Sequence, residues 1–567
     1  MFIDFEGIDG SGKTTLSNLL AGRLRRLGYK VAHAREGGEL QAPTARRIRE
    51  LTRDSALLEM GARTEFFLNV SRDAQQLEEV IAPALARGEV CISDRYLYSQ
   101  LALSGGGRGL PLKELESSCE LASNGIWPEL VVLVDVEPDL ARLRKRLGKL
   151  KEGRGSDSDS RKGLAGAGLA VRMREAFLAM ASKDPARWLI IENNDQPLWV
   201  LEQRIVDAVV ARLEGREPQV QRIVPAAHPV PEGPVTVDSV EEHFLHGLDS
   251  LEVREPGLAV WMLGGLPGLG AHQRRLAAVE RFPGLAVRSL MGLEDEASWA
   301  LREVLAKVVP VDVTASLGAS QSRQAMTLRK QLSLLAPGEV AAGLKGNDSP
   351  EAWALREQAM KGRQLAQVLL GLAGVDGEVA WSVRELGIQQ KLYSEVARSL
   401  TGLSGERVDA LREVLLKHDR LSVLRSVTGL DSPFANGLRE ELADKALKLV
   451  LRSLTGLTTD ESFALREQGA PLTKEAIDSI DGLEDHRAWR LREAYAERWP
   501  ATVLSSLRGL HLDERAEALI TQVLSSAPGR LPLLRNAYAV IATAHETLSG
   551  RVSRRETTTG SEPQLSL

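Results

Sequence analysis

The sequence predicts two successive fold classes, a parallel α/β domain and an all-helical solenoid. Up to about residue 214, short apolar runs alternate with segments of helical length, a pattern typical of a parallel sheet with crossover helices. Beyond residue 238, the phrase Ser-Leu-x-Gly-Leu returns about every 27 residues, which indicates stacked helical units. Prolines in residues 215–237 separate the two patterns and favour an extended connector.

The apolar runs of the first part predict a five-stranded parallel sheet with helices on both of its faces. Each run has five or six residues, the length of an ordinary buried strand. In chain order, the predicted strands are residues 2–6, 30–34, 89–93, 130–135 and 188–192.

Each unit of the second part predicts a helix, a glycine stop, a short turn rich in Asp, Ser and Thr, and a second helix. Glycine suits the left-handed position that ends a helix, and Asp or Thr can cap the next one. The glycine-equivalent positions are Gly265, Gly292, Ala319, Gly346, Gly374, Gly402, Gly429, Gly456, Gly482 and Gly509, spaced 26 to 28 residues apart.

Two short helices cannot bury their apolar faces alone, whereas about ten stacked pairs can. We therefore predict an α-solenoid, HEAT-like but with a shorter period. The last unit, around Gly509, lacks the Leu-Arg-Glu phrase of the others, as a terminal cap would.

An arginine recurs after most of these glycines, and an aromatic residue often precedes it. The pattern permits a ligand-binding ladder or a structural ladder between repeats, and we favour the structural interpretation because repeats need contacts that fix their register. The arginines are Arg302, Arg329, Arg356, Arg384, Arg412, Arg439, Arg466 and Arg492, and the aromatic residues are Trp299, Trp353, Trp381, Phe463 and Trp489.

The composition excludes several classes of protein. The 567 residues carry a formal net charge of −5, so the chain is not a generally basic nucleic-acid-coating protein, and the solenoid has no basic stripe that would indicate nucleic-acid binding. No apolar run is long enough for a membrane span, and the first residues do not resemble an export signal. Two cysteines are too few for a disulfide framework and favour the cytoplasm.

These patterns divide the chain into four predicted segments. Residues 1–214 form the α/β domain, residues 215–237 the proline-rich linker and residues 238–550 the solenoid. The polar tail, residues 551–567, is expected to be disordered.

The clearest chemical signal is the phosphate-binding pattern G-x-x-x-x-G-K-[ST] between the first predicted strand and a helix. Its backbone N–H groups can surround the phosphates of ATP, Lys13 can reach the β and γ phosphates, and Thr14 can bind Mg²⁺. The residues assigned to the ATP phosphates are Gly7, Ile8, Asp9, Gly10, Ser11, Gly12, Lys13, Thr14 and Thr15.

With Phe5-Glu6 before this loop and Thr15 after it, residues 1–214 resemble the thymidylate kinase family of P-loop nucleoside monophosphate kinases. Further segments carry the resemblance in order. They are residues 35–38 (Arg-Glu-Gly-Gly, without the family's proline), 80–85 (Val-Ile-Ala-Pro-Ala-Leu), 93–96 (Ser-Asp-Arg-Tyr), 105–110 (Gly-Gly-Gly-Arg-Gly-Leu) and 128–130 (Pro-Glu-Leu).

The resemblance implies a role for each matching residue. Lys13 and Arg95 would contact the transferring phosphoryl group and the acceptor phosphate, and Thr14 and Asp94 would hold Mg²⁺ directly or through water. Asp9 would contact the acceptor sugar, and Arg144 would lie at the ATP phosphates. The residues assigned to the acceptor nucleotide are Arg35, Arg49, Leu68, Arg72, Arg95 and Ser99.

We expect a mobile lid to supply the positive charge that stabilises the transition state of phosphoryl transfer. Some family members carry an arginine in the phosphate loop, where this sequence has Gly10, so the lid must supply the charge. We predict an extended lid over residues 153–160, with Arg161 as the catalytic cation and Arg154 in reserve.

The base-binding side departs from the family pattern. Leu68 replaces a phenylalanine that stacks on thymine, and Leu103 and Ser104 replace a tyrosine and a glutamine. The resemblance implies ATP- and Mg²⁺-dependent phosphorylation of dTMP to dTDP, with two alternatives: a kinase of another nucleoside monophosphate, or a nucleotide-sensing scaffold. The solenoid would then bind a protein partner, and the family suggests a homodimer through the kinase domain.

Overall fold

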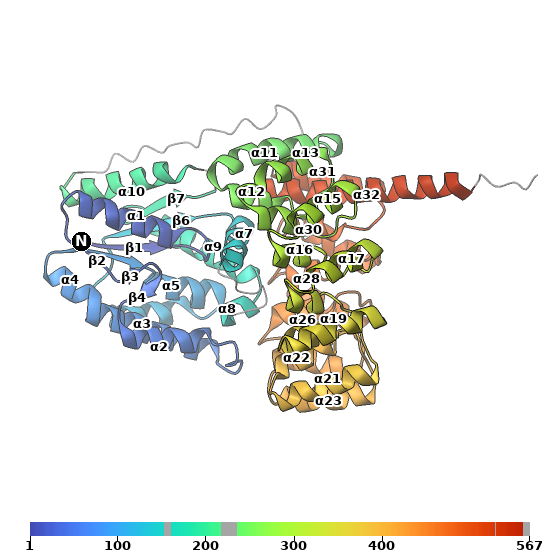
Figure 1. Ribbon diagram of the computed structural model, residues 1–567. Helices are drawn as coiled ribbons and strands as arrows, with labels where there is room; N and C mark the ends of the chain where they lie inside the picture. Colours follow the sequence, from blue (N-terminus) through green and yellow to red (C-terminus); the bar gives the residue numbers. More distant parts are fainter. Residues whose placement is uncertain (152–159, 195, 217–234, 528, 559–567) are drawn as a thin grey trace, which may run out of the picture. The chain divides into compact units, whose positions relative to one another are not determined.

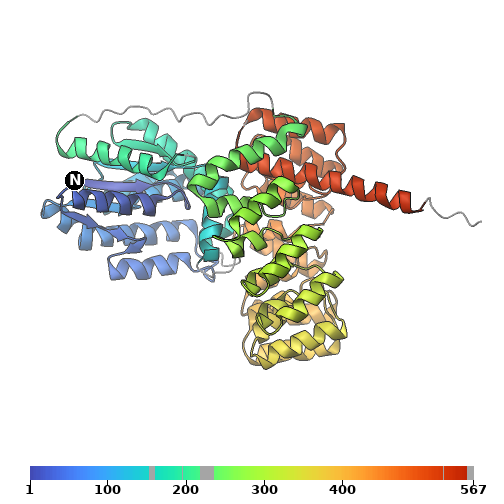
Figure 2. The ribbon, with the colours of Figure 1, turned by 45° about the horizontal axis from the view of Figure 1, so that its top comes forward.

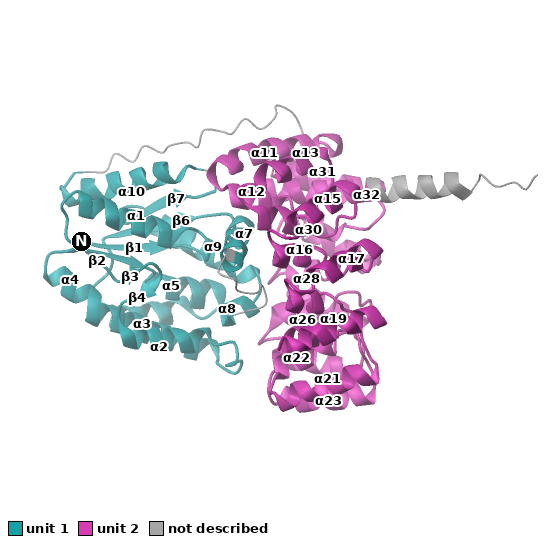
Figure 3. Cartoon of the chain, viewed as in Figure 1, with its two compact units in different colours: residues 1–228 teal, residues 229–567 magenta. Residues whose placement is uncertain are grey.

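The structure, a computed structural model, describes residues 1–151, 160–194, 196–216, 235–527 and 529–558. The chain divides into two compact units, residues 1–228 and 229–567 (Figure 3). Most of the predicted linker, residues 217–234, and most of the predicted lid, residues 152–159, lie outside the described residues.

The first unit contains the predicted five-stranded parallel sheet (Figure 1). Its strands, in the order β2-β5-β1-β6-β7, are β2 (Val31–His33), β5 (Val90–Asp94), β1 (Phe2–Glu6), β6 (Leu130–Asp135) and β7 (Trp188–Glu192). A small antiparallel hairpin, β3 (Arg35–Glu36) with β4 (Glu39–Leu40), follows β2 and was not predicted.

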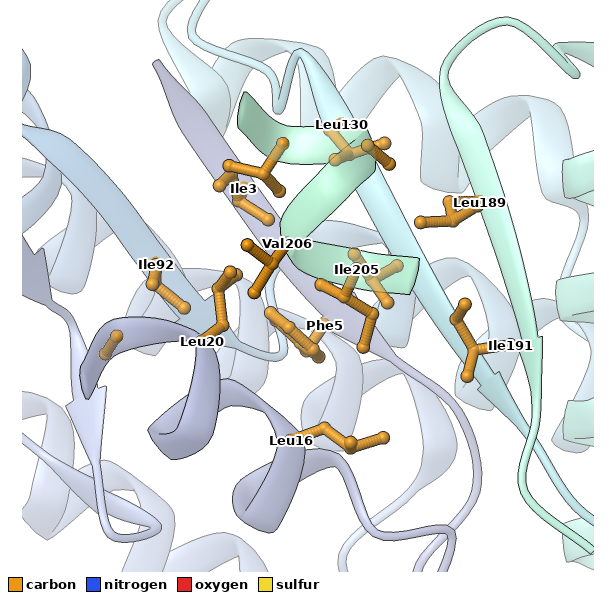
Figure 4. Close-up of a cluster of buried hydrophobic side chains, with 14 of the residues drawn as sticks. Ile3, Phe5, Leu16, Leu20, Ile92, Leu130, Leu189, Ile191, Ile205 and Val206 are labelled. Atoms are coloured by element: carbon orange, nitrogen blue, oxygen red, sulfur yellow. The ribbon is translucent and has the colours of Figure 1, made fainter. Parts of the chain in front are cut away.

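Helices cover both faces of this sheet, as alternating side chains require. On one face, α1 and α10 bury Leu16, Leu20 and Ile205 against Ile3 and Phe5 (Figure 4). Strand residues of the opposite face pack against α3, α6, α7 and α9. The helices are α1 (Lys13–Arg26), α2 (Pro43–Arg53), α3 (Ala62–Gln76), η1 (Leu77–Ile81), α4 (Ala82–Ala86), α5 (Leu97–Gln100), η2 (Leu101–Gly107), α6 (Leu112–Ser123), α7 (Pro138–Lys151), α8 (Arg161–Leu164), α9 (Gly168–Lys183) and α10 (Leu198–Leu213).

The strand order fixes where a ligand can bind. β1 pairs with β5 on one side and with β6 on the other, so the connections after β1 and β5 leave the same carboxyl edge of the sheet. In an open parallel sheet, this edge is where ligands bind. The loop after β1 and Arg95 after β5 are therefore neighbours.

The second unit is built from pairs of helices, as the repeat predicted. We call the first, shorter helices of the pairs the short row and the second helices the long row. The long row is α13 (Leu269–Ala278), α15 (Glu296–Leu305), α17 (Arg323–Leu332), α19 (Pro350–Lys361), α21 (Glu378–Gln389), α23 (Glu406–Leu416), α25 (Pro433–Leu442), α27 (Asp460–Gly469), α29 (His486–Ala494) and α31 (Glu514–Ser526). The short row is α12 (Pro256–Met262), α14 (Pro283–Arg288), α16 (Pro310–Ser316), α18 (Pro337–Ala342), α20 (Leu365–Leu370), α22 (Tyr393–Ser399), α24 (Arg420–Ser426), α26 (Leu447–Ser453), α28 (Glu475–Asp478) and α30 (Pro500–Ser506).

Local sequence signals set the ends of these helices. Side chains such as Asp295, Ser349 and Thr459 accept a hydrogen bond from the first turn of a long-row helix. The predicted glycine positions after the short row all have positive φ, except the one occupied by Ala319. In that unit the left-handed residue is Gly318, with φ 52°, rather than Ala319, because glycine adopts this conformation without a Cβ clash.

The recurring arginines of the repeat, which we call the ladder arginines, are buried, and all except Arg329 bridge neighbouring units. Arg302 donates from Nη2 to the Leu290 carbonyl (2.7 Å) and from Nε to Ser316 Oγ (3.1 Å), and it stacks on the Trp299 ring. These groups belong to the ends of α14 and α16, so one guanidinium joins two short-row helices. Arg275 plays the same part in the first unit and was not predicted, because the Leu-Arg-Glu phrase is absent there.

The row of helices closes on itself, which the repeat pattern did not predict. Helix α32 (Leu531–Thr558) lies beside α30 of the last pair and beside α11 (Val240–Arg254), which precedes the first pair. Arg535 donates to the Gly264 carbonyl (2.5 Å), and the Tyr538 hydroxyl donates to the Pro267 carbonyl (2.8 Å). Figure 2 shows α32, in red, beside the green start of this unit. The solenoid is therefore a closed ring rather than an open stack with a cap.

Two predicted boundaries differ from the structure. The short 3₁₀ turn η3 (Val237–Ser239) begins inside the predicted linker, where Thr236 and Ser239 form a capping box. Residues 551–558, expected to be disordered, continue helix α32, since no proline interrupts the helix before Pro563. Residues 559–567 lie outside the described residues. In the part of the chain that is described, no helix has the length and apolar character that a membrane crossing requires.

Candidate active site

The phosphate loop joins β1 to α1, and its conformation depends on glycine. Gly7, Gly10 and Gly12 have φ values of 138°, 89° and 99°. A Cβ at Gly10 would lie 2.2 Å from the Ala141 carbonyl oxygen of α7. The loop therefore has no room for a side chain at this position. Some members of the family carry an arginine here.

Lys13 lies at the start of α1 and folds back over the loop. Its Nζ donates to the Ile8 carbonyl (2.8 Å) and lies 3.4 Å from Ser11 Oγ. Burial, reinforced by the positive charge of Arg95, lowers the pKa of Lys13 to about 8. The ammonium group is held in the concave side of the loop, where phosphate would bind.

Thr14 and Asp94 meet across the carboxyl edge of the sheet. The Thr14 hydroxyl donates to the Asp94 carboxylate, although 80 residues separate them in the chain. Hydroxyl and carboxylate oxygens are ligands that Mg²⁺ accepts. The structure thus brings together the two residues that the sequence assigned to the metal.

Arg95 is the centre of a buried network. Its φ of 83° is unusual for a residue with a side chain. Nη2 lies 2.6 Å from Asp9 Oδ1, and Nη1 lies 2.9 Å from Ser99 Oγ and 3.8 Å from Glu6 Oε2. The carboxylates raise the pKa of Arg95 despite its burial, so the guanidinium stays charged.

Asp9 lies among several cations. Lys145 Nζ is 3.2 Å from its Oδ2, whereas Arg95 contacts its Oδ1. Burial would raise the pKa of Asp9, but Arg95, Lys145, Lys162 and Lys13 hold it well below its usual range. Asp9 is therefore ionised at neutral pH.

A second group of arginines lies beside the first. Arg35 donates to the carbonyls of Gly38 (2.9 Å) and Asp94 (3.2 Å). Burial, together with Arg35, Arg53 and Arg72, lowers the pKa of Arg49 to about 10. Cations that depress one another's pKa form a site that an anion would stabilise.

The residues expected at the base have other contacts. Arg72 donates from Nε (2.8 Å) and Nη2 (2.6 Å) to Asp73 Oδ1 and from Nη1 to Asn69 (3.2 Å). Leu68 is half-buried on α3. Leu103 is buried in the core beside α9, so the position that carries tyrosine in the family pattern serves packing here.

Arg161 lies elsewhere than the prediction implied. Its Nη1 and Nη2 donate to the carbonyls of Leu57 (2.5 Å) and Met60 (2.7 Å), in the connection between α2 and α3. The groups that affect its pKa are burial, Glu65 and Arg108, rather than Lys13 or Arg95. The catalytic role of Arg161 stays a prediction, and the backbone carbonyls that hold its guanidinium here leave no trace in a sequence. Arg154 lies outside the described residues.

Comparison with known proteins identifies this arrangement. The family model described as thymidylate kinase matches residues 5–205. The thymidylate kinase of Trichlorobacter lovleyi is 37% identical over 215 residues, which are 38% of this chain and 98% of the relative. That of Caldanaerobacter subterraneus subsp. tengcongensis is 34% identical, over 38% of this chain and 97% of the relative.

The chain belongs to the thymidylate kinase family. A crystal structure of thymidylate kinase from Ehrlichia chaffeensis also matches, with 21% identity over 37% of this chain and 98% of that chain and a TM-score of 0.28. The N-terminal domain is a phosphotransferase enzyme of this family, and the matched relatives end before the ring begins.

The kinase domain also holds residues that the sequence patterns missed. Asn193, directly after β7, donates from Nδ2 to the Ser11 carbonyl of the phosphate loop (2.7 Å). Arg144 Nη1 in turn donates to the Asn193 carbonyl (2.7 Å), so Arg144 supports the loop through Asn193. A polar residue at the carboxyl end of a predicted parallel strand was the available signal for Asn193.

Proposed function

We propose that the kinase domain transfers the γ-phosphoryl group of ATP to dTMP, giving dTDP and ADP, with Mg²⁺. The observation that carries this proposal is the position of Arg95. It lies beside Asp9 of the phosphate loop and is followed along the same edge by the Arg35 and Arg49 cluster. A donor phosphate at the loop and an acceptor phosphate at the arginines would face each other.

The donor side is supported by the phosphate loop. Lys13 would contact the β and γ phosphates, and the backbone N–H groups of the loop would surround them. Thr14 and Asp94 would hold Mg²⁺, which would neutralise charge on the phosphates. Asn193 and Arg144 keep the loop in place from beneath.

The acceptor side is supported by the Arg95 network. Asp9 and Glu6 hold the guanidinium through Oδ1 and Oε2, and Ser99 donates to Glu6 at 2.6 Å. Such a preorganised cation needs no rearrangement when negative charge develops during transfer. Glu6, whose pKa is raised by burial in spite of Arg95, positions Arg95 and does not contact the nucleotide in this proposal.

Thymine is proposed as the base from the names of the relatives. The side chains that depart from the family pattern favour an alternative, a kinase of another nucleoside monophosphate. Leu68 cannot stack as an aromatic ring does, and Arg72 already donates to Asp73 and Asn69. Hydrogen-bonded base recognition discriminates strongly, whereas apolar contacts discriminate weakly.

The test is steady-state ADP production by the full chain with ATP, Mg²⁺ and each of dTMP, dUMP, dCMP, dGMP and dAMP. We expect turnover with dTMP, and a loss of at least about 10²-fold in kcat for Lys13→Ala. Turnover that favours another monophosphate would support the alternative. Absence of turnover with all five would exclude both and leave nucleotide sensing.

We further propose that the ring is an interaction domain for a protein partner. In two neighbouring units, α15 and the turns that follow α15 and α17 expose aliphatic side chains. These are Val304, Val308 and Leu334, which are 71%, 63% and 83% exposed. Exposed aliphatic groups of this kind are typical of binding surfaces. The homodimer that the family suggests stays a prediction, which light scattering of the full chain would test.

A further inference from the structure

The proposed reaction needs a cation at the transferring phosphoryl group besides Lys13 and Arg95, because negative charge spreads over its oxygens in the transition state. The phosphate loop cannot supply this cation from Gly10, since a Cβ there would collide with α7. Arg161 is engaged by the Leu57 and Met60 carbonyls. Within residues 1–151, 160–194 and 196–216, which the structure describes, the cation must therefore come from another residue.

Lys162, the next residue of α8, has the surroundings that Arg161 lacks. The charged groups that act on its ammonium group are Asp9 of the phosphate loop, Arg95 after β5, and Glu65 and Arg72 of α3. They come from the three elements that surround the phosphate-binding edge of the sheet. Lys162 is half-buried, and among the described residues it has no hydrogen-bond or ion-pair partner.

The two neighbouring side chains of α8 therefore have different tasks. Arg161 fastens the helix to the connection between α2 and α3, with its guanidinium 4.0 Å from Glu65 Oε2, and Leu164 is buried below it. With the helix fixed in this way, residue 162 points away from residue 161 by roughly 100° around the axis. On that other side, Lys162 interacts electrostatically with Asp9 and Arg95, whose side chains are themselves 2.6 Å apart.

We propose that Lys162, rather than Arg161, is the cation that α8 supplies to the transferring phosphoryl group; this inference rests on the proposed function. In the transfer, an oxygen of the acceptor phosphate forms a bond to the γ phosphorus. The bond from that phosphorus to the β–γ bridging oxygen breaks, and its electron pair stays on ADP. Lys162 donates hydrogen bonds to the transferring oxygens and keeps its proton throughout.

The charge of Lys162 gives the proposal a pH signature. Burial and Arg95 lower its pKa to about 7, although Asp9 and Glu65 oppose this. In the free protein Lys162 is charged below pH 7 and loses its charge as the pH rises, so kcat/KM should fall through about pH 7. Bound phosphates stabilise the ammonium form, and kcat should therefore fall only at a higher pH.

The test compares Lys162→Met, Lys162→Arg and Arg161→Met with the wild-type full chain. The matched control is Lys183→Met, because Lys183 is exposed on the surface of α9. For Lys162→Met we expect kcat to fall about 10²- to 10³-fold, with the KM for dTMP changed less than about threefold. Lys162→Arg should recover most of kcat and lose the fall in kcat/KM near pH 7, because arginine stays charged. Lys183→Met should match the wild type.

A second measurement follows the charge of Lys162 directly and does not depend on turnover. In protein with ¹³C-methylated lysines, the NMR signal that disappears in Lys162→Arg should titrate near pH 7, and ADP with aluminium fluoride and dTMP should move it to higher pH. Circular dichroism of each variant checks that it folds.

Three outcomes overturn the inference. The first is a kcat of Lys162→Met within twofold of the wild type. The second is a fall in kcat/KM near pH 7 that persists in Lys162→Arg, and the third is a loss of kcat in Arg154→Met or Arg161→Met that Lys162→Met does not share. A wild type without turnover on any monophosphate contradicts the proposed function as well, whereas an active wild type with an active Lys162→Met contradicts the role of Lys162 alone.

Discussion

At the scale of single residues, the kinase domain depends on glycines at which a Cβ atom would collide with neighbouring backbone. Gly10 has the φ of a left-handed residue and lies against the Ala141 carbonyl. Gly28, at the end of α1, has nearly the same φ, 92° against 89°, but nothing lies within 4 Å of its Cβ position. This pair separates the effect of backbone strain from the effect of crowding.

We expect Gly10→Ala to weaken ATP binding at least about tenfold, since the phosphate loop must move away from α7 to accept the methyl group. Gly28→Ala carries similar strain and should reduce the free energy of unfolding by about 1 kcal/mol without changing ATP affinity. Isothermal titration calorimetry and urea unfolding measure the two effects. Equal ATP affinities for the two variants would show that crowding at Gly10 is unimportant.

Sequence patterns predicted part of this site and missed part of it. The phosphate loop and the residues Thr14, Asp94, Arg95 and Asp9 were singled out in advance, because each belongs to a local motif at a strand end, whereas the contacts between them were found in the structure. Asn193, and Lys162 in the role proposed for it, were missed, because both depend on segments far along the chain.

At the scale of elements, the ladder arginines other than Arg329 act as joints between short-row helices, while Arg329 donates to two carbonyls that both follow α16. Arg492 donates from Nε to Ser506 Oγ (3.0 Å) and from Nη2 to the Ile480 carbonyl (2.9 Å), and its side chain is fully buried. No carboxylate is within ion-pair distance of it among the described residues, so burial lowers its pKa to about 10. The guanidinium remains charged at neutral pH and is satisfied by dipoles of hydroxyls and carbonyls.

Arg492→Met should lower the free energy of unfolding of the ring by about 2 to 4 kcal/mol, because buried carbonyls lose their donors. Arg490→Met, two residues away on the exposed side of the same helix, should change it by less than about 0.5 kcal/mol. The measurement is the urea midpoint of the ring, followed by tryptophan fluorescence. Similar midpoints for both variants would argue against the structural interpretation of the ladder.

Helix caps in the ring should respond to pH. The Asp419 carboxylate caps α24, accepting hydrogen bonds from the Ser422 backbone (2.9 Å) and the Ser394 hydroxyl (2.6 Å). These hydrogen bonds outweigh burial and lower the pKa of Asp419. A lowered pKa means that the stabilisation is present above the pKa of the unfolded chain and is lost as the pH falls through the folded value.

We therefore expect Asp419→Ala to lower the free energy of unfolding by about 1 kcal/mol at pH 7. The difference from the wild type should shrink as the pH falls below about 3.8. Asp419→Asn, which keeps a capping oxygen, should lose less and show little of this pH dependence. Urea unfolding at several pH values measures all three proteins, and a pH-independent difference for Asp419→Ala would rule out a contribution from ionisation.

At the scale of the whole molecule, the period of about 27 residues predicted stacked helix pairs but not the closure of the ring. Closure depends on Arg535 with Gly264 and on Tyr538 with Glu241, pairs that lie 271 and 297 residues apart. A repeat pattern describes neighbours, and these contacts are between the two ends. They also explain why α32 does not follow the repeat.

Deleting residues 531–567 should open the ring, because it removes the helix that covers Phe244 and α30. We expect a lower urea midpoint of the ring and increased binding of the dye ANS to the exposed apolar surface, whereas kcat of the kinase domain, which has its own core, should stay within about threefold. Deleting only residues 559–567 is the control. An unchanged midpoint after the larger deletion would mean that α32 does not hold the ring together.

The closed ring restricts how this protein can change during evolution. An open stack of repeats tolerates duplication or loss of a unit, because only the stack's length alters. Here a gained or lost unit of about 27 residues would move the first and last units apart or into collision, and α32 could no longer reach both α11 and α30. The number of units is therefore fixed by geometry, while the sequences on the outer surface are free to diverge.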